Sequence, residues 1–324
     1  MKKTILVTGG LGFIGTNLVK RLLRVTDYHI VILDKSTYAG RIENILDNAK
    51  TQKRVKIIKG DVTKKRDVND AIKNVTSVVH MAADTHASRS LKNALPIVRT
   101  NVIGTTILLE AVEKHEVERF ILLSSSEVYG DQIKGVPMDE KHPLNPVTPY
   151  AASKLASDRI AYSFFLAKKL PVVIIRPFNA YGPYQHLEKM IPLFITRLLR
   201  GLPITLNHGG KPKRDWVYVD DHGRAIETLL KEPNEKVLGE IFNIGTGKAT
   251  SIKDIAQLIL KALGMNSSYL KIKHNSLPET AENVGISKKA KKILGWTPKI
   301  SLEEGIQKTV QWYKNNRLWW EKIV

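Results

Sequence analysis

A glycine-rich turn near the start of the chain constrains its fold more than any other feature. The segment Thr8-Gly9-Gly10-Leu11-Gly12-Phe13-Ile14-Gly15 follows an apolar run at 4–7 and precedes apolar residues at helical spacing. The glycines at 9, 12 and 15 let the backbone turn sharply and let a pyrophosphate approach the N–H groups that begin the helix. Because the pattern stands between a strand and a helix, it predicts a dinucleotide site.

Short β-branched runs alternate with longer helical patterns through the first half of the chain. Strands are predicted at 4–7, 29–33, 55–58, 75–80, 120–123 and 172–175, with helices between them, notably at 98–115 and 150–167. This alternation is typical of an α/β protein with a Rossmann-type, doubly wound parallel sheet. After 176–177 prolines and glycines become frequent, which predicts a smaller C-terminal α/β lobe. We assign 1–178 to an NAD-binding domain, to which 216–245 returns, and 179–324 to a substrate lobe.

Composition narrows the class of protein. The chain has 324 residues, 43% of them hydrophobic, and no cysteine, which predicts a folded core and excludes a disulfide scaffold and a cysteine nucleophile. The His, Asp and Glu residues show no metal-ligand spacing, so we predict no metal. We see no apolar run near the roughly 20 residues of a membrane span and no signal peptide, so we expect a cytoplasmic protein without a membrane partner. The charge of +20 is spread along the chain, and we expect no nucleic-acid partner.

Residues at successive strand ends extend the predicted dinucleotide site. Asp34 ends the second strand, where a carboxylate accepts the ribose hydroxyls and repels a 2′-phosphate, so NAD is favoured over NADP. Asp61 and Val62 follow the third strand, and Met81-Ala82-Ala83 follow the fourth. The carboxyl ends of parallel strands line one crevice, so we expect these residues to lie together.

A second group of residues carries acid–base chemistry. Tyr150 and Lys154 are one helical turn apart, and a nearby ammonium and a cationic nicotinamide both favour the phenolate, so we expect the pKa of Tyr150 to fall toward neutrality. Ser125 and Ser126 follow the fifth strand, where a hydroxyl can bond a sugar hydroxyl undergoing oxidation. Glu127 is a candidate second acid–base group.

Together these residues resemble the extended short-chain dehydrogenase/reductase family, in its nucleotide-sugar epimerase and dehydratase branch, over nearly the whole chain. The resemblance extends to the stretches 34–40, 82–86, 181–185 and 214–216. It implies a nucleotide-diphosphate sugar as substrate, a homodimer, and Ser125 beside the catalytic tyrosine. The residues it implies for NAD are Phe13, Ile14, Asp34, Lys35, Ser36, Thr37, Asp61, Val62, Ala82, Thr100, Tyr150 and Lys154. Those it implies for the nucleotide sugar are Thr85, Asn179, Lys189, Met190, Arg214 and Asn243.

Two departures from the family pattern bear on the activity. Ser126 stands where many of the family's dehydratases have the aspartic acid that protonates the leaving hydroxyl, and the segment 277–283 carries no arginine for the second phosphate. We predict an NAD-dependent nucleotide-sugar 4,6-dehydratase that works through a 4-keto sugar, with Ser125, Ser126, Glu127, Tyr150 and Lys154 as its catalytic residues.

Three alternatives stay open. A 4-epimerase needs only Ser125, Tyr150 and Lys154. A decarboxylase acting on a UDP-glucuronate needs a cation for the substrate carboxylate, for which Arg214 is the candidate. A dinucleotide-binding regulatory or RNA-associated protein needs no activated phenol, so the intact pair of Tyr150 and Lys154 argues against it.

Overall fold

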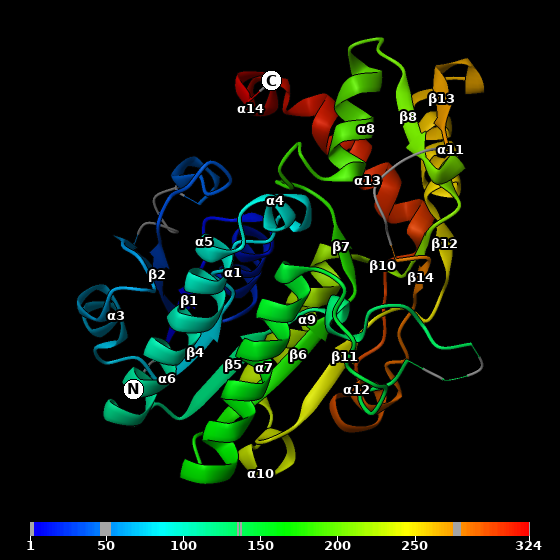
Figure 1. Ribbon diagram of the computed structural model, residues 1–324. Coiled ribbons are helices and arrows are strands. Elements are labelled where there is room, and N and C mark those ends of the chain that lie inside the picture. Colours follow the sequence, from blue (N-terminus) through cyan, green and yellow to red (C-terminus); the bar gives the residue numbers. More distant parts are fainter. Residues whose placement is uncertain (1–2, 46–52, 135, 137, 275–279, 324) are drawn as a thin grey trace.

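A parallel sheet forms the centre of the molecule (Figure 1). The structure is a computed structural model and describes residues 3–45, 53–134, 136, 138–274 and 280–323. Within these residues the sheet has seven strands in the order β11-β6-β5-β4-β1-β2-β3. Their bounds are β1 Thr4–Thr8, β2 His29–Asp34, β3 Val55–Lys59, β4 Ser77–His80, β5 Arg119–Leu123, β6 Val172–Pro177 and β11 Ile241–Ile244. All their pairings are parallel, which confirms the predicted α/β fold.

The strand order reverses beside β1, and this determines where a ligand can bind. β1 pairs with β2 on one side and β4 on the other, so that Val7 lies opposite both Ile32 and Val79. The connecting segments that follow β1 and β4 therefore run in opposite directions. This opens a crevice at the carboxyl ends of the strands. Thr8, Asp34 and His80 end their strands at this crevice.

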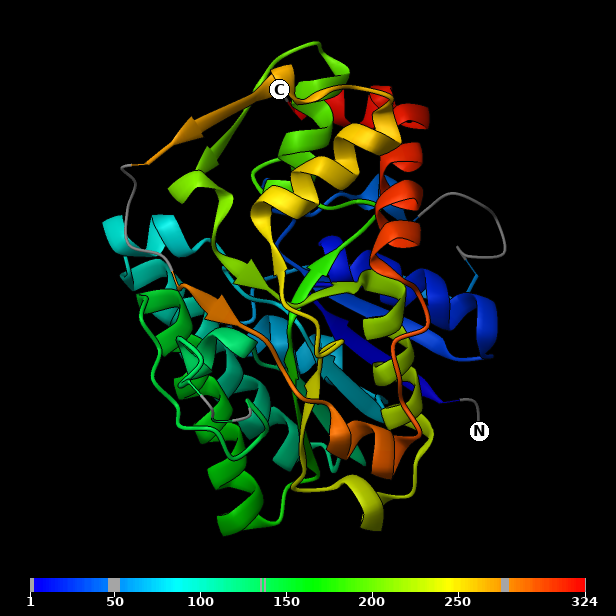
Figure 2. The same cartoon turned by 90° about the vertical axis from the view of Figure 1, so that its right-hand side faces the viewer.

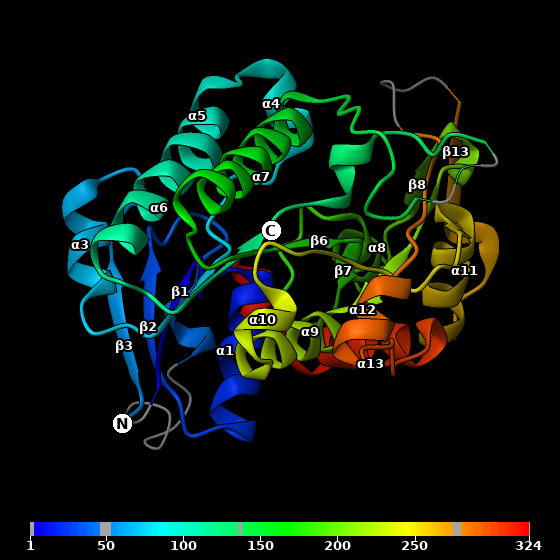
Figure 3. The same ribbon diagram turned by 90° about the horizontal axis from the view of Figure 1, so that it is seen from below.

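Helices cover both faces of the sheet (Figure 3). One apolar core lies between the sheet and the helices α1, α9 and α12, and a second lies between the sheet and α3, α6 and α7. The strands on this sheet are apolar on both faces, as expected where both are covered. The helix bounds are α1 Phe13–Val25, α3 Lys65–Ile72, α6 Gly104–Lys114, α7 Pro149–Lys168, α9 Val219–Lys231, α10 Asn234–Val237 and α12 Lys288–Leu294.

One long helix runs through three consecutive elements. α5 (Leu95–Val98) continues through the π-helical η2 (Arg99–Ile103) into α6, and α4 (Ala87–Lys92) precedes it. The span Leu95–Lys114 is 20 residues long with a mean hydropathy of 1.3, so by length and composition it could cross a membrane. The expectation that no apolar run reaches this length was therefore wrong. Within the protein 44% of that stretch is buried, and it packs against α3 and α7.

The C-terminal lobe lies above the carboxyl ends of the strands (Figure 2). A third apolar core joins its helices, and Tyr313 and Trp320 are fully buried in it. Its helix bounds are α8 Met190–Leu199, α11 Ile252–Leu263, α13 Leu302–Asn315 and α14 Arg317–Trp320. Its strand bounds are β7 Asn179–Tyr181, β8 Ile204–Asn207, β9 Lys213–Arg214, β10 Trp216–Tyr218, β12 Thr250–Ser251, β13 Leu270–Lys273 and β14 Glu282–Asn283. Short 3-10 turns are η1 Ile42–Asn44, η3 Ser126–Tyr129, η4 His208–Gly210, η5 Ser267–Tyr269 and η6 Glu321–Ile323.

The chain passes between the two parts more than once. β11 pairs with β6 at the edge of the sheet, and α9 packs on α1. Residues 288–296, which we assigned to the C-terminal lobe, instead bury Ala290, Leu294 and Trp296 in the core beneath the sheet. α9 and β11 lie within 216–245, the segment that we assign to the NAD-binding domain, and residues 288–296 share the same core.

Candidate active site

The glycine turn forms a cradle at the start of α1. Gly9 has a φ of +70°, and a Cβ there would lie 2.7 Å from the Ala82 nitrogen. A Cβ on Gly15 would lie 2.2 Å from the Gly9 carbonyl oxygen, so both positions require glycine. Gly12 is the N-cap of α1, whose first turn has no side-chain cap and no acidic residue. The N–H groups at this end therefore face a space suited to an anion.

Asp34 is held against this turn. Its Oδ2 accepts a hydrogen bond from the Leu11 N–H at 3.0 Å, and its Oδ1 accepts one from the Ser36 N–H at 2.8 Å. Burial raises the pKa of the Asp34 carboxyl above its ordinary value, and the two N–H groups oppose this rise. Lys35, next in the chain, pairs with Asp61 at 2.7 Å. The structure thus brings together the predicted residues at the ends of β2 and β3.

A buried histidine fixes the loop after β4. Thr8 Oγ1 lies 2.7 Å from His80 Nδ1, and His80 Nε2 lies 2.9 Å from Thr105 Oγ1. Burial, and then the charge of Lys154, lower the pKa of His80 to about 3, so the ring stays neutral. Thr8 Oγ1 also accepts hydrogen bonds from the N–H groups of Met81 and Ala82, both at 3.2 Å. This bonding places the loop 81–83 against the glycine turn.

The cradle fits a dinucleotide. A Cβ on Gly12 would lie 3.4 Å from the Gly9 carbonyl oxygen and, apart from its two neighbours in the chain, more than 4 Å from every other described part of the chain. The turn is therefore open on the side where a pyrophosphate would approach. Ile14 and Phe13 begin the helix beside it, and Thr100 lies half-buried on η2. Val62 is buried against Gly104, where it supports the wall rather than lining its surface.

Tyr150 and Lys154 lie buried on α7. The helix begins at Pro149, and its N-cap Thr148 accepts a hydrogen bond from the Ala151 N–H at 3.1 Å. Lys154 Nζ donates to the Leu123 carbonyl oxygen at 2.5 Å, at the end of β5. Burial lowers the pKa of Lys154 to about 8, although the charge of Asp158 opposes this.

The environment of the Tyr150 phenol differs from the expectation. Burial raises the pKa of Tyr150 above 10, the negative charge of Glu127 raises it further, and a hydrogen bond with Ser125 lowers it. In the polypeptide by itself burial therefore outweighs the effect expected from Lys154, whose ammonium is directed to a backbone carbonyl. A positive charge on a bound coenzyme would favour the phenolate.

Glu127 and Ser126 lie in the short turn η3 beside the phenol. The Ser125 side chain is the N-cap of this turn and accepts the Glu127 N–H at 3.2 Å. Ser126 is buried. Glu127 is half-buried; its charge adds to the rise that burial causes in the pKa of Tyr150, and it opposes the fall that burial causes in the pKa of Lys189. The structure therefore brings a carboxylate, a phenol and an ammonium to one place.

The predicted sugar-binding residues divide into two groups. Lys189 Nζ donates to the Thr85 carbonyl oxygen at 2.9 Å, which joins two of them across the crevice. Met190 begins α8, Asn179 begins β7, and Arg214 ends β9.

Asn243 lies apart from these residues. Its Oδ1 accepts a hydrogen bond from the Tyr129 hydroxyl at 2.7 Å, and its Nδ2 donates to the Met138 carbonyl at 3.1 Å. Its side chain is fully buried and bonded at both amide atoms, which indicates a structural role rather than contact with a sugar.

Three residues that support the site escaped the sequence analysis. Asn101 Nδ2 donates to Ser153 Oγ at 2.9 Å and its Oδ1 accepts the Asp84 N–H at 2.9 Å, which ties the loop after β4 to α7. Asn283 Nδ2 donates to the carbonyls of Ser126 and Gly130 and so holds η3. Asp215 accepts four hydrogen bonds, from residues 246, 247 and 285. Of the predicted arginine-free segment, residues 277–279 lie outside the described residues.

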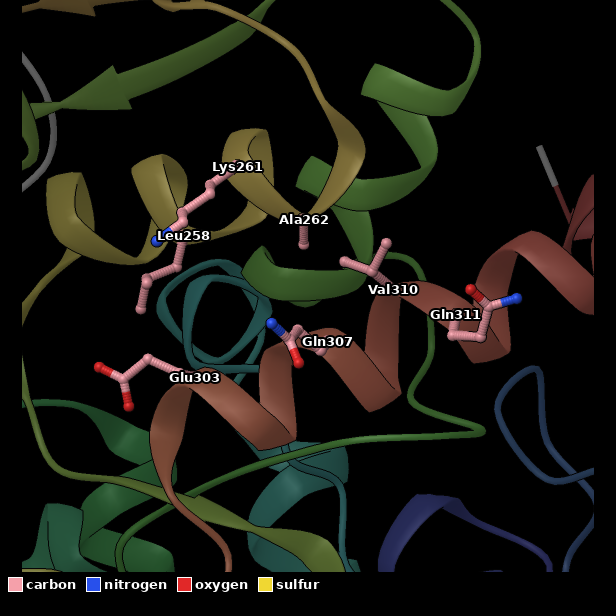
Figure 4. Close-up of a pocket in the computed structure, with 7 residues that line it drawn as sticks. All are labelled: Leu258, Lys261, Ala262, Glu303, Gln307, Val310 and Gln311. Atoms are coloured by element: carbon pink, nitrogen blue, oxygen red, sulfur yellow. The ribbon is translucent and has the colours of Figure 1, made fainter.

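A separate cavity of about 360 Å³ lies in the C-terminal lobe, between α11 and α13 (Figure 4). The residues that line it are Leu258, Lys261, Ala262, Glu303, Gln307, Val310 and Gln311. These residues include none of the predicted site residues, so the cavity is distinct from the crevice above the sheet.

The chemistry available in this crevice is limited by its geometry. A dinucleotide held in the glycine cradle would extend from Asp34 along the carboxyl ends of the strands toward Tyr150 and Ser125. Tyr150, as its phenolate, can take a proton from an alcohol that Ser125 holds, while a bound dinucleotide would take the hydride. The fold and the site together define a dehydrogenase-type enzyme that acts on a substrate hydroxyl.

The comparisons with known proteins define the family. A family model described as GDP-mannose 4,6-dehydratase matches residues 6–309, and the chain belongs to this family of NAD-dependent nucleotide-sugar enzymes. A dTDP-glucose 4,6-dehydratase of Streptomyces niveus is 37% identical and covers 98% of this chain and 95% of its own length. The crystal structure of DesIV, a dTDP-glucose 4,6-dehydratase from Streptomyces venezuelae with NAD bound, matches with a TM-score of 0.93 at 36% identity, over 99% of this chain and 100% of that one.

Epimerases are similar too, at lower identity. A UDP-glucose 4-epimerase of Thermotoga maritima matches with a TM-score of 0.89 at 29% identity, over 97% of this chain and 99% of that one. These comparisons confirm the predicted family, the predicted Rossmann-type fold, the predicted enzyme class and NAD as the coenzyme.

Proposed function

We propose that the chain is a dTDP-glucose 4,6-dehydratase that keeps and recycles its NAD. The observation that carries this proposal is the position of Glu127 in the turn η3, where Ser125, the hydrogen-bond partner of the Tyr150 phenol, also accepts the Glu127 N–H at 3.2 Å. An enzyme that only moves a proton and a hydride at carbon 4 has no use for a second acid–base group there. Support also comes from the dTDP-glucose dehydratases among the similar proteins.

The first step is the oxidation of the sugar at carbon 4. Tyr150 takes the proton of the 4-hydroxyl, and Ser125 holds that hydroxyl and the phenol in hydrogen-bond contact. NAD held in the glycine cradle would supply the acceptor for the hydride from carbon 4 and the donor of that hydride to carbon 6. Lys154, held by the Leu123 carbonyl, keeps positive charge behind the tyrosine.

The second step is the loss of water across carbons 5 and 6. The ketone at carbon 4 acidifies the hydrogen on carbon 5, and Glu127 takes that proton. The hydroxyl on carbon 6 leaves with a proton as water, and the hydride returns to carbon 6. Solvent supplies a proton to carbon 5, and Tyr150 returns the 4-hydroxyl proton to solvent, which gives a 4-keto-6-deoxy sugar and restores both residues.

Because residue 126 is a serine and not an acid, a single carboxylate must carry the proton transfers of the second step. In this protein Ser126 is buried, and its carbonyl is bonded by Asn283. A serine hydroxyl is too weak an acid to protonate a leaving group at neutral pH. We therefore assign both proton transfers of the elimination to Glu127, which first accepts the carbon 5 proton and then delivers it to the departing hydroxyl.

A panel of nucleotide sugars tests the proposed activity. Purified protein, without added NAD, is incubated separately with dTDP-glucose, UDP-glucose, GDP-mannose and UDP-glucuronate, and each product is examined by mass spectrometry and proton NMR. We expect loss of one water, with the highest rate on dTDP-glucose. Inversion at carbon 4 without a mass change would identify an epimerase, loss of carbon dioxide would identify a decarboxylase, and unchanged sugars would favour a binding protein. Each of these three results would contradict the proposal.

We also propose a soluble cytoplasmic homodimer in which the long helix Leu95–Lys114 and α4 pack against a second copy. Large apolar side chains are exposed along these helices, with Leu95 70% and Leu91 55% exposed. Exposed apolar patches of this kind mark interfaces between proteins.

A charged residue among these exposed apolar side chains tests the dimer. We expect Leu95→Glu to convert the protein to a monomer in analytical ultracentrifugation, because a carboxylate would be buried without a partner. Leu318→Glu is the control, since Leu318 is 79% exposed on α14 and lies on another element. A monomeric parent, or a Leu95→Glu protein that dimerises like the parent, would exclude this interface.

A further inference from the structure

The segment 35–45 wraps over the end of the dinucleotide cradle. It leaves β2 at Asp34 and returns to the glycine turn, where the Arg41 N–H donates to the Leu11 carbonyl at 3.2 Å. The backbone at Gly40 lies close to the Asp34 carboxylate, since a Cβ on Gly40 would be 3.0 Å from Asp34 Oδ1. The segment therefore encloses the carboxylate that we assign to the coenzyme ribose.

The first tie between this segment and the rest of the molecule is centred on Glu188, which precedes α8. The Tyr38 hydroxyl donates to Glu188 Oε1 at 2.8 Å, and the Arg89 guanidinium pairs with Oε2 of the same carboxylate. The Arg89 guanidinium also lies 4.3 Å from the centre of the Tyr38 ring. His186 packs edge-on against that ring, with the ring centres 4.9 Å apart. Three segments distant in the sequence meet at one carboxylate.

Glu188 is well placed to hold this tie. Its side chain is only 14% exposed, whereas that of Arg89 is 47% exposed. Charge-assisted hydrogen bonds gain strength when water is partly excluded, and a single carboxylate can accept several. The next residue, Lys189, reaches the Thr85 carbonyl, so the same turn also contacts the sugar side of the crevice.

The second tie is centred on Trp319 in α14. Its Nε1 donates to Asn44 Oδ1 at 2.7 Å, and its carbonyl accepts from Arg41 Nη1 at 2.5 Å. The Arg41 guanidinium also lies 5.0 Å from the centre of the indole ring. Trp319 is fixed in turn by the ring of Trp312, at 5.0 Å between centres.

We propose that residues 35–45 form a strap that retains NAD between turnovers, and that Glu188 and Trp319 are the positioning residues that fasten the strap to the C-terminal lobe. This rests on the proposed function, in which the coenzyme is regenerated in every cycle and need not leave. A dinucleotide in the cradle would lie beneath a segment that is tied at Tyr38 to Glu188 and at Arg41 and Asn44 to Trp319. It can leave only after both ties have opened, so their removal raises the rate of release.

The rate of NAD exchange tests the strap without any sugar chemistry. Protein loaded with radiolabelled NAD is diluted into a large excess of unlabelled NAD, and the label that remains bound is followed with time. Loss of one hydrogen bond to a charged group changes an equilibrium about tenfold, so we expect about tenfold faster release from Glu188→Gln. Tyr38→Phe and Trp319→Phe remove single donors, and we expect a smaller acceleration from each and a larger one from the double variant. Glu304→Gln, which breaks the surface pair of Glu304 with Lys308, is the control and should release NAD at the parental rate.

The outcomes separate the strap from the function it serves. Thermal unfolding establishes that each variant is folded before its exchange rate is compared. Release rates within twofold of the parent in Glu188→Gln, Tyr38→Phe and Trp319→Phe would overturn the strap, while dehydration of dTDP-glucose by the parent would still support the proposed function. A parent that binds no NAD would overturn both.

Discussion

Replacement of Tyr150 by phenylalanine is expected to lower kcat for dTDP-glucose by about 10³-fold, because a positioned acid–base group contributes 10²–10⁴-fold. The Tyr150→Phe change removes the phenol oxygen that we assign as the acceptor of the 4-hydroxyl proton, and it leaves a ring of nearly the same shape in a buried site. The fold and the glycine cradle should be unaffected. The measurement is the rate of product formation by NMR, together with the amount of NAD bound per chain.

Tyr162 provides the matched control for this prediction. It lies on the same helix α7, where its ring contacts Phe165 and the Arg159 guanidinium rather than the crevice. Tyr162→Phe should turn over at the parental rate. If Tyr150→Phe kept more than a tenth of the parental kcat while binding NAD normally, the tyrosine would not be the base at carbon 4.

Replacement of Glu127 by glutamine is the second large effect, and it acts on a different step. Because the amide cannot take the carbon 5 proton, we expect the release of water to slow by about 10³-fold. Oxidation at carbon 4 should continue, because Ser125, Tyr150 and Lys154 are unchanged. On mixing with dTDP-glucose, the Glu127→Gln protein should therefore show the near-ultraviolet absorbance of reduced coenzyme without forming the 6-deoxy product.

Two further variants sharpen the assignment of Glu127. Glu127→Asp retains a carboxylate and should recover part of the rate of water release. Glu282→Gln removes an exposed carboxylate on β14 that pairs with Lys213 at 3.9 Å, and it should behave like the parent. Normal loss of water from Glu127→Gln would exclude Glu127 as the group that carries the elimination.

Sequence patterns predicted the sheet and the cradle because both depend on local features. Glycine at 9 and 15 is required by backbone contacts of 2.7 and 2.2 Å within the turn and its neighbouring loop. Strand ends that follow one another along the chain are brought together by parallel pairing alone, which explains how Asp34 and Asp61 could be placed. Tyr150 and Lys154 share a face of α7 for an equally local reason.

Features that depend on distant contacts escaped the sequence analysis. The spacing of Tyr150 and Lys154 gave no sign that the ammonium bonds the Leu123 carbonyl, so the effect of Lys154 on the phenol was overestimated. Asn243 matches a family position, yet its amide is used by Tyr129 and Met138, more than 100 residues away in sequence. The return of α12 to the core beneath the sheet likewise depends on packing of Trp296 that no local pattern encodes.

The charge of +20 is not explained by the site. Several lysines form surface pairs, such as Lys65 with Glu110 at 2.8 Å and Lys168 with Glu113 at 2.7 Å. Exposed pairs of this kind contribute little to stability.

The most direct test of the central claim uses dTDP-glucose labelled with deuterium on carbon 4. The proposed cycle removes this deuterium as hydride and returns it to carbon 6 of the same molecule. We therefore predict a product that has lost one water and carries the label in its new methyl group, without exchange into solvent. Label that stays on carbon 4, in a sugar of unchanged mass with that carbon inverted, would show that the enzyme is an epimerase and would contradict the account.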